Sequence, residues 1–193
     1  MKIILASNSP RRKELLDGLD LDFQVLVMKG IDESYPNGLG KCEIAEYISR
    51  KKAESYRLSE NYLLITADTI VWLDGEVLGK PKDEADAICM LHKLSGRTHQ
   101  VITGVTLRWN SSGSNGYSTF SCVTDVTFAG LSDEQIKYYV RKYRPLDKAG
   151  AYGIQEWIGY VGVTSLNGSY YNVMGLPVQR LTEELKRLNL IIK

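Results

Sequence analysis

Asp68 is the residue whose surroundings point most directly to chemistry. It lies inside the apolar run LLITADTIVWL, where a carboxylate is costly to bury unless a cation, a metal ion or a functional cleft compensates it. A buried aspartate bonded to a turn is the alternative. We favour the functional interpretation because α/β proteins place sites at the ends of central strands. Asp32 and Glu33 could add metal-binding carboxylates, although a solvated loop explains them equally well.

A serine- and arginine-rich segment near the N-terminus provides groups that bind anions. Ser9 followed by Pro10 predicts the start of a helix, and the unpaired N–H groups of a helix start attract phosphate. Ser7 adds a hydroxyl group, and Arg11 or Arg12 can bind a phosphate through two parallel hydrogen bonds. Taken alone, an ordinary capped helix with two solvated arginines is the simpler interpretation.

Lysines at two further places provide separate positive charges. Lys52 lies on a predicted helix, and Lys80 stands between a glycine and a proline that fix its backbone in a tight turn. Such rigidity suits a point charge held against a phosphate, and it also suits a plain turn. We interpret Lys51 and Lys82 as solvated.

The segment DKAGAYGIQ, residues 147–155, combines small residues with a terminal amide. Small residues allow the backbone to approach a ligand closely. The amide of Gln155 can both donate and accept, as reading the edge of a base requires. A structural glycine turn explains the segment equally well. The two histidines lack cysteine or serine partners that would indicate a zinc site or a triad, so we interpret both as structural.

The elements expected around these residues alternate between strand and helix. Strands are predicted over 2–6, 23–28, 62–73, 76–79, 99–109 and 117–128, and helices from Ser9-Pro10, over 41–58, from Asp83 to Leu94, over 132–143 and from Pro177. The turn-rich sequence NSSGSNG joins the last two strands. This pattern predicts an α/β protein whose long mixed sheet is flanked by helices.

The composition limits the classes of partner. The formal net charge of +1 over 193 residues predicts no general attraction to a nucleic acid polymer or an anionic membrane. The three scattered cysteines indicate a reduced, cytoplasmic protein, and the N-terminal run is interpreted as a strand and not as a signal peptide. Local cations opposite a carboxylate suit a triphosphate with a divalent metal. The residues alone therefore predict binding of a phosphorylated small molecule and leave its cleavage open.

Five blocks of sequence resemble the Maf family of nucleotide pyrophosphatases. In chain order they are LASNSPRRKELL, ADTIVWLDGEVLGKP, LSGRTHQVITGV, DKAGAYGIQ and NGSYYNVMGLP, and the likeness extends from about residue 3 to 185. It implies an elongated, bent mixed β-sheet with flanking helices, similar to the inosine triphosphate pyrophosphatases. It also implies one catalytic domain over residues 1–193, with two merged lobes and the active-site cleft between them.

The resemblance further implies hydrolysis between the α and β phosphates with a divalent cation, Mg or Mn. Asp68 resembles the general base and a metal contact, and Glu33 resembles a second acidic site residue. The expected phosphate-binding residues are Ser7, Ser9, Arg12, Lys52 and Lys80.

Three positions resemble the branch of the family that prefers dTTP and UTP, namely Arg11, Thr69 and Gln155. The branch acting on 7-methyl-GTP has Glu where this chain has Gln155. An amide can donate to and accept from the O4 and N3–H of thymine or uracil. Glu156-Trp157 stands where many relatives have glycine, and its bulk and charge could trim the pocket.

The implied role is removal of unwanted or modified nucleotides, including modified pyrimidine triphosphates, with a link to restraint of cell division. The resemblance also implies a homodimer. Two rival functions remain at this point. One is a non-catalytic, nucleotide-binding regulator of septum formation, and the other is a phosphomonoesterase that removes the terminal phosphate.

Overall fold

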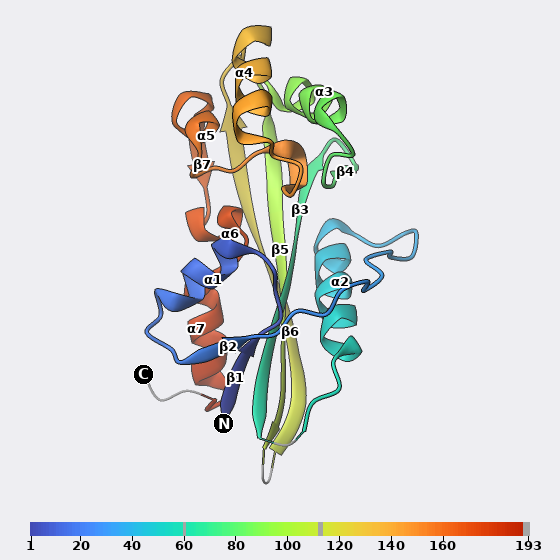
Figure 1. Ribbon diagram of the computed structural model, residues 1–193, viewed down its shortest axis with the longest axis vertical. Helices are drawn as coiled ribbons and strands as arrows, with labels where there is room; N and C mark the ends of the chain where they lie inside the picture. The colour runs from blue at the N-terminus through green and yellow to red at the C-terminus, as the bar shows by residue number, and fades with distance from the viewer. Residues whose placement is uncertain (60, 112–113, 191–193) are drawn as a thin grey trace. The chain divides into compact units, whose positions relative to one another are not determined.

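The computed structural model describes residues 1–59, 61–111 and 114–190 (Figure 1). Its strands are β1 (Lys2–Leu5), β2 (Phe23–Val25), β3 (Tyr62–Leu73), β4 (Glu76–Leu78), β5 (Thr98–Ser111), β6 (Ser114–Phe128) and β7 (Val163–Asn167). Its helices are α1 (Pro10–Asp17), α2 (Lys41–Ser55), α3 (Glu84–Leu94), α4 (Asp133–Tyr143), the 3₁₀ turn η1 (Ala149–Ala151), α5 (Trp157–Gly162), α6 (Tyr170–Met174) and α7 (Val178–Arg187).

The described strands form one mixed, seven-stranded sheet. Its order is β2-β1-β3-β5-β6-β7, and β4 pairs with β3 off this path. The N-terminal strand β1 is parallel to both of its neighbours, whereas β3 with β4 and β6 with β7 are antiparallel. Nearly every residue of β3 is buried, which explains its continuous apolar sequence. The predicted mixed sheet flanked by helices is confirmed.

The chain divides into two compact units. Unit 1 comprises Met1–Asp68, Thr103–Cys122 and Gly175–Lys193, and unit 2 comprises Thr69–Ile102 and Val123–Met174. The long strands β3, β5 and β6 therefore contribute residues to both units. The boundary within β3 falls directly after Asp68. The expectation of a single catalytic domain stays a prediction.

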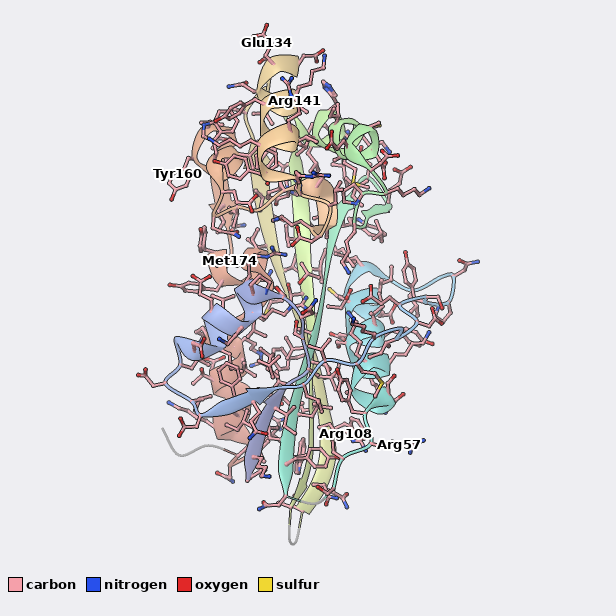
Figure 2. All side chains as sticks on the ribbon, in the orientation of Figure 1. Arg57, Arg108, Glu134, Arg141, Tyr160 and Met174 are labelled. Atoms are coloured by element: carbon pink, nitrogen blue, oxygen red, sulfur yellow. The ribbon has the colours of Figure 1, made fainter. Side chains whose placement is uncertain are left out.

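In unit 1, α1 and α7 lie on one side of the strands and α2 lies on the other (Figure 1). A Cβ atom built on Gly104 of β5 would lie 2.3 Å from the carbonyl carbon of Ala45, so only glycine lets the backbone of α2 approach so closely. At the C-terminal end of α2, Arg108 Nη1 donates to the carbonyl oxygens of Ala53 at 3.0 Å and Tyr56 at 2.8 Å. Figure 2 labels Arg108. These bonds satisfy carbonyl groups that the end of α2 leaves open.

Unit 2 contains α3, α4, η1, α5 and α6. Helices α3 and α4 pack side by side (Figure 1). Asp83 caps α3 and accepts from the backbone of Asp86, and Ser132 with Gln135 forms the predicted capping box of α4. At the centre of this unit the ring of His99 makes edge contacts with Phe128 and Tyr152. His99, Phe128 and Tyr152 are all buried. His99 is therefore packed as a structural residue, as the sequence indicated.

Two predicted boundaries and one predicted turn differ from the structure. The strand predicted over 23–28 ends at Val25 because β1, its partner, ends at Leu5. The predicted helix over 41–58 ends at Ser55, where Tyr56 becomes extended. The turn predicted for NSSGSNG, residues 110–116, is largely strand: β5 extends to Ser111 and β6 begins at Ser114. Residues 112–113, at its centre, lie outside the described residues. Among the described helices, none has the length and apolar character needed to cross a membrane.

Candidate functional site

Lys52 joins the two carboxylates predicted to act in the site. Its Nζ lies 2.6 Å from Asp68 Oδ1 and 2.9 Å from Glu33 Oε1, all within unit 1. The side chains of Lys52 and Asp68 are 13% and 12% exposed, whereas that of Glu33 is 46% exposed. The ammonium group offsets the repulsion between the carboxylates, which compensates the burial of Asp68.

A chain of buried hydroxyl groups fixes α2 against β3. Thr66 Oγ1 donates to the carbonyl oxygen of Ser49 at 2.7 Å, and Ser49 Oγ bonds Thr106 Oγ1 at 2.9 Å. Ser49 precedes Lys52 by one helical turn, and Thr66 lies two residues before Asp68 on the same face of its strand. The hydroxyl bonds therefore set the register that brings the lysine to the aspartate. Asp68 itself lies within β3 and not at a strand end as expected.

The start of α1 places Arg12 beside the carboxylates. Ser9 is the N-cap and Pro10 the first helical residue, as predicted. Arg12 Nε donates to the carbonyl oxygen of Gly175 at 2.8 Å, and its Nη1 donates to Ser7 Oγ at 3.4 Å. Burial lowers the pKa of Arg12, and the nearby carboxylate of Asp68 opposes that shift. The charges of Arg11 and Glu33 also act on Arg12. Ser7, Ser9, Arg12, Lys52, Glu33 and Asp68 therefore gather in unit 1.

Lys51 is not the solvated lysine that the sequence indicated. Its Nζ bonds Asp32 Oδ2 at 2.7 Å and the carbonyl oxygen of Ser34 at 3.1 Å. Asp32 in turn accepts from the backbone of Ser34 at 2.9 Å, and these bonds lower the pKa of Asp32. The clamp closes the loop on both sides of Glu33. Asp32 therefore holds the loop. This structural role explains the carboxylate without a metal ion.

The two carboxylates fit a magnesium or manganese ion that a nucleotide helps to coordinate. No cluster of three or more potential metal ligands occurs among the described residues. Mg²⁺ in nucleotide sites is commonly held by one or two carboxylates together with substrate phosphates and water. Asp68 and Glu33 each have one oxygen on the same Lys52 Nζ, so these oxygens lie close together. This donor set suits a hard cation that arrives with a triphosphate.

Unit 2 brings two of the predicted segments together. The backbone N–H of Gly150 donates to the carbonyl oxygen of Gly79 at 3.0 Å, which joins DKAGAYGIQ to the turn that carries Lys80. Gly150 has a φ of 66°, and a Cβ atom there would lie 2.8 Å from a methyl group of Val71. Only glycine fits this turn. Lys80 is exposed and Thr69 is half-buried.

Gln155 carries a buried amide oxygen that lacks a hydrogen-bond partner among the described residues. Buried polar atoms are nearly always satisfied, so each exception calls for an explanation, and a ligand that donates to this oxygen would supply one. The residue follows a tight segment in which Gly153, Ile154 and the preceding two residues are all buried. An amide presented in this way is suited to reading a base.

Sequence reasoning missed several contacts that hold the predicted residues within each unit. The carbonyl oxygen of Gly175 holds Arg12, and the Lys51 clamp holds the loop around Glu33. No local signal identifies either contact, since both join segments far apart in the chain. Tyr139 was also missed, although its hydroxyl contacts Glu156 next to Gln155. The unusual Glu156-Trp157 pair was the signal for that contact.

Comparison with solved structures first defines the fold. The chain resembles the structure of the Staphylococcus aureus Ham1 protein with a TM-score of 0.51, at 18% identity, covering 96% of this chain and 98% of that one. At this identity the likeness shows the fold alone. It agrees with the mixed sheet and flanking helices described above.

Comparison of sequences then shows the family. The family model described as Maf-like protein matches residues 2–188, and the chain belongs to this family. It is 61% identical over 189 residues to the dTTP/UTP pyrophosphatase of Phocaeicola vulgatus, covering 97% of this chain and 96% of that protein. It is 58% identical over 192 residues to the dTTP/UTP pyrophosphatase of Bacteroides thetaiotaomicron, with the same coverage of each chain.

Proposed function

We propose that this protein hydrolyses dTTP and UTP to the nucleoside monophosphate and pyrophosphate. The observation that carries the proposal is the position of Lys52 between Asp68 and Glu33, beside Arg12. These four charged residues lie in a chain of the Maf family, and two similar proteins are named dTTP/UTP pyrophosphatases. Ordinary surface charges would not account for a buried aspartate bonded to a lysine whose side chain is only 13% exposed.

In the proposed reaction Asp68 accepts a proton from water as the water oxygen attacks the α-phosphorus. The bond between the α-phosphorus and the bridging oxygen breaks, and pyrophosphate leaves with the bonding electrons. Arg12 and Lys52 offset the charge that develops on the phosphates, and Ser7 and Ser9 provide hydroxyl donors. Lys80, on the turn bonded to Gly150, contributes a further positive charge.

The proposal includes a divalent cation, Mg or Mn. Asp68 and Glu33 are the residues that would hold it, with the phosphates supplying the remaining ligands. Such a cation polarises phosphoryl oxygens and so stabilises negative charge in the transition state. The role of the protein residues is to orient the nucleotide and to hold the ionised carboxylates in place.

Base preference is assigned to Arg11, Thr69 and Gln155. The buried, unpartnered Gln155 oxygen supports this role, because pyrimidine N3–H is a donor that could satisfy it. The substrates include modified pyrimidine triphosphates, and the cellular role is removal of unwanted nucleotides with a link to restraint of cell division. We further propose a homodimer located in the cytoplasm.

The rival function is a non-catalytic, nucleotide-binding regulator of septum formation. A pure binder has no need of a water-activating carboxylate, and the Lys52–Asp68 contact supports catalysis over binding alone. A phosphomonoesterase is the other alternative, and its products would be a diphosphate and orthophosphate.

A hydrolysis panel with resolved products tests the proposal. The substrates are dTTP, UTP, CTP, GTP and 7-methyl-GTP, each with magnesium, with manganese and with a chelator. We expect pyrophosphate and a monophosphate, formed fastest from dTTP and UTP and only with a metal present. Orthophosphate release would contradict the cleavage site, and binding without either product would favour the regulator. Turnover undiminished by the chelator would remove the metal from the proposal.

A further inference from the structure

The turn that presents Gln155 is closed at both ends by defined contacts. The backbone N–H of Glu156 donates to the carbonyl oxygen of Gly153 at 3.0 Å, so that Ile154 and Gln155 lie inside the turn. Helix α5 packs directly beneath it, because a Cβ atom on Gly159 would lie 1.8 Å from the Ile154 carbonyl oxygen. These backbone contacts set the path of the turn, and side-chain contacts add to them.

Tyr139 of α4 contacts both ends of the same turn. Its hydroxyl accepts from the backbone N–H of Gly153 at 3.0 Å and donates to the Glu156 carboxylate. Tyr139 is fully buried, and burial together with the adjacent Glu156 raises its pKa, which keeps the phenol protonated as a donor. One hydroxyl group thus bonds both residues that flank Ile154 and Gln155. It accepts from Gly153 and donates to Glu156.

The side chains of Glu156 and Trp157 turn toward α4 and Lys148. Lys148 Nζ lies 3.2 Å from Glu156 Oε1, and the lysine side chain is only 9% exposed. The Trp157 ring makes an edge contact with the Tyr138 ring at 4.9 Å between centroids. Both side chains are therefore engaged by contacts within unit 2. By contrast, Tyr160 of the same helix α5 points to solvent (Figure 2).

Gly153 lies directly beneath this carboxylate. A Cβ atom there would lie 2.9 Å from Glu156 Cδ and 3.2 Å from Lys148 Cε. The Glu156 carboxylate therefore packs over the turn and is bonded by both Tyr139 and Lys148. Such a buried, satisfied polar network specifies one arrangement of the residues that it joins.

We propose that Tyr139 and Glu156 are positioning residues for base preference, which act by holding the turn that carries Gln155 and so the placement of its amide. This inference rests on the proposed function, since it concerns the base of the nucleotide that the protein hydrolyses. Neither residue needs to touch the substrate. Their role explains why an acidic residue follows Gln155 in this chain.

Uracil and cytosine differ in a way that makes the orientation of an amide decisive. Uracil presents O4 as an acceptor and N3–H as a donor, whereas cytosine presents an N4 amino donor and an N3 acceptor. An amide held in one orientation suits one pattern, and rotation by half a turn exchanges its donor and acceptor. Loosening the turn should therefore weaken discrimination between UTP and CTP more than it weakens phosphate chemistry.

The test measures kcat/KM for UTP and CTP in matched variants of the full chain. Tyr139→Phe removes the hydroxyl from the turn, and we expect the UTP/CTP ratio to fall about tenfold, as for loss of one base contact. Tyr138→Phe on the same helix is the control, because among the described residues its hydroxyl bonds the exposed Lys142 and no group of the turn. The control should keep the wild-type ratio.

Two further variants separate positioning from general damage. Glu156→Ala should lower the ratio as Tyr139→Phe does, whereas Glu156→Gln keeps an oxygen acceptor for Tyr139 and should restore most of it. In a Gln155→Ala background, Tyr139→Phe should leave the ratio unchanged, because its effect acts through Gln155. Urea unfolding checks that each variant is folded under the assay conditions.

The outcomes are distinguishable. Equal losses on UTP and CTP, or an unchanged ratio in Tyr139→Phe and Glu156→Ala, would overturn the positioning role and leave the proposed function in place. A further fall of the ratio in the Gln155→Ala background would also overturn it. Absence of turnover by the wild-type protein on any nucleotide would overturn the proposed function, and this inference with it.

Discussion

At the scale of single residues, the central feature is a lysine shared by two acids. Lys52 bonds Asp68 at 2.6 Å and Glu33 at 2.9 Å. A lysine so placed can hold both carboxylates in one small volume without a metal ion, and it can bind a phosphate when one arrives. The same three residues therefore serve the stability of the buried Asp68 and the chemistry proposed for it.

Asp68→Asn should abolish turnover while leaving the fold intact. The amide keeps an oxygen that accepts from Lys52, but it cannot take a proton from water. We expect the rate of pyrophosphate release to fall about 10³-fold, a usual value for loss of a general base. Pyrophosphate release measures the rate, and urea unfolding measures stability. A near-normal rate in a folded variant would remove Asp68 from the mechanism.

Lys51→Met should lower kcat/KM about fivefold, because loss of this partly exposed ion pair with Asp32 releases the loop around Glu33. Steady-state kinetics on dTTP measures the effect. Lys51→Arg keeps the positive charge and is the matched control.

A double substitution decides whether Lys51 acts through Glu33. In a Glu33→Gln background, Lys51→Met should have no further effect on kcat/KM. Additive losses from the two substitutions would instead show that Lys51 contributes by a separate route, and the clamp would then be purely structural.

The candidate residues could be predicted from sequence because their types and positions are local signals. Ser9-Pro10 announces a helix start, and Asp68 is conspicuous in an apolar strand. Their partners could not be predicted in the same way. The contacts of Arg12 with Gly175 and of Lys51 with Asp32 join residues whose proximity depends on the tertiary fold.

At the scale of elements, α2 carries Lys52 and packs through backbone contact against β5. Gly104→Ala should destabilise the protein by about 3 kcal/mol or more, because the new methyl group would meet the α2 backbone, which cannot yield as a flexible side chain can. Urea unfolding measures the change. Gly130→Ala is the control, because a Cβ atom there meets nothing within 4 Å. Equal stability of the two variants would contradict the close packing.

Element boundaries followed local signals where these were strong. The long β3 strand, the Asp83 cap and the Ser132–Gln135 capping box are all as predicted. The short elements η1, α5, β7 and α6 were not predicted. They contain few residues and depend on tertiary contacts, such as the approach of Gly159 to Ile154, that outweigh local preference.

At the scale of the whole molecule, the balance of charge matters less than its distribution. The net charge is +1, so attraction of a triphosphate depends on local cations such as Arg12 and Lys52. The sequence established this balance directly. It could not establish which cations gather around Asp68, because that depends on the packing of α1 and α2 in unit 1.

Stability should decrease as pH falls from 7 toward 4, in part because of His99. Burial lowers the pKa of His99 to about 4 from 6.5, so between these values the unfolded chain binds a proton that the folded protein does not. The free energy of unfolding therefore falls with decreasing pH, by about 3 kcal/mol from this residue. Urea unfolding at several pH values measures it. His99→Gln should flatten this window, and an unchanged slope would contradict the assignment.

The measurement that tests the central claim most directly is hydrolysis of dTTP in ¹⁸O-labelled water with magnesium, followed by mass spectrometry of both products. Attack of water on the α-phosphorus places the label in dTMP and leaves pyrophosphate unlabelled, which is the predicted result. Label in pyrophosphate, or release of labelled orthophosphate with dTDP, would contradict the proposed attack at the α-phosphorus.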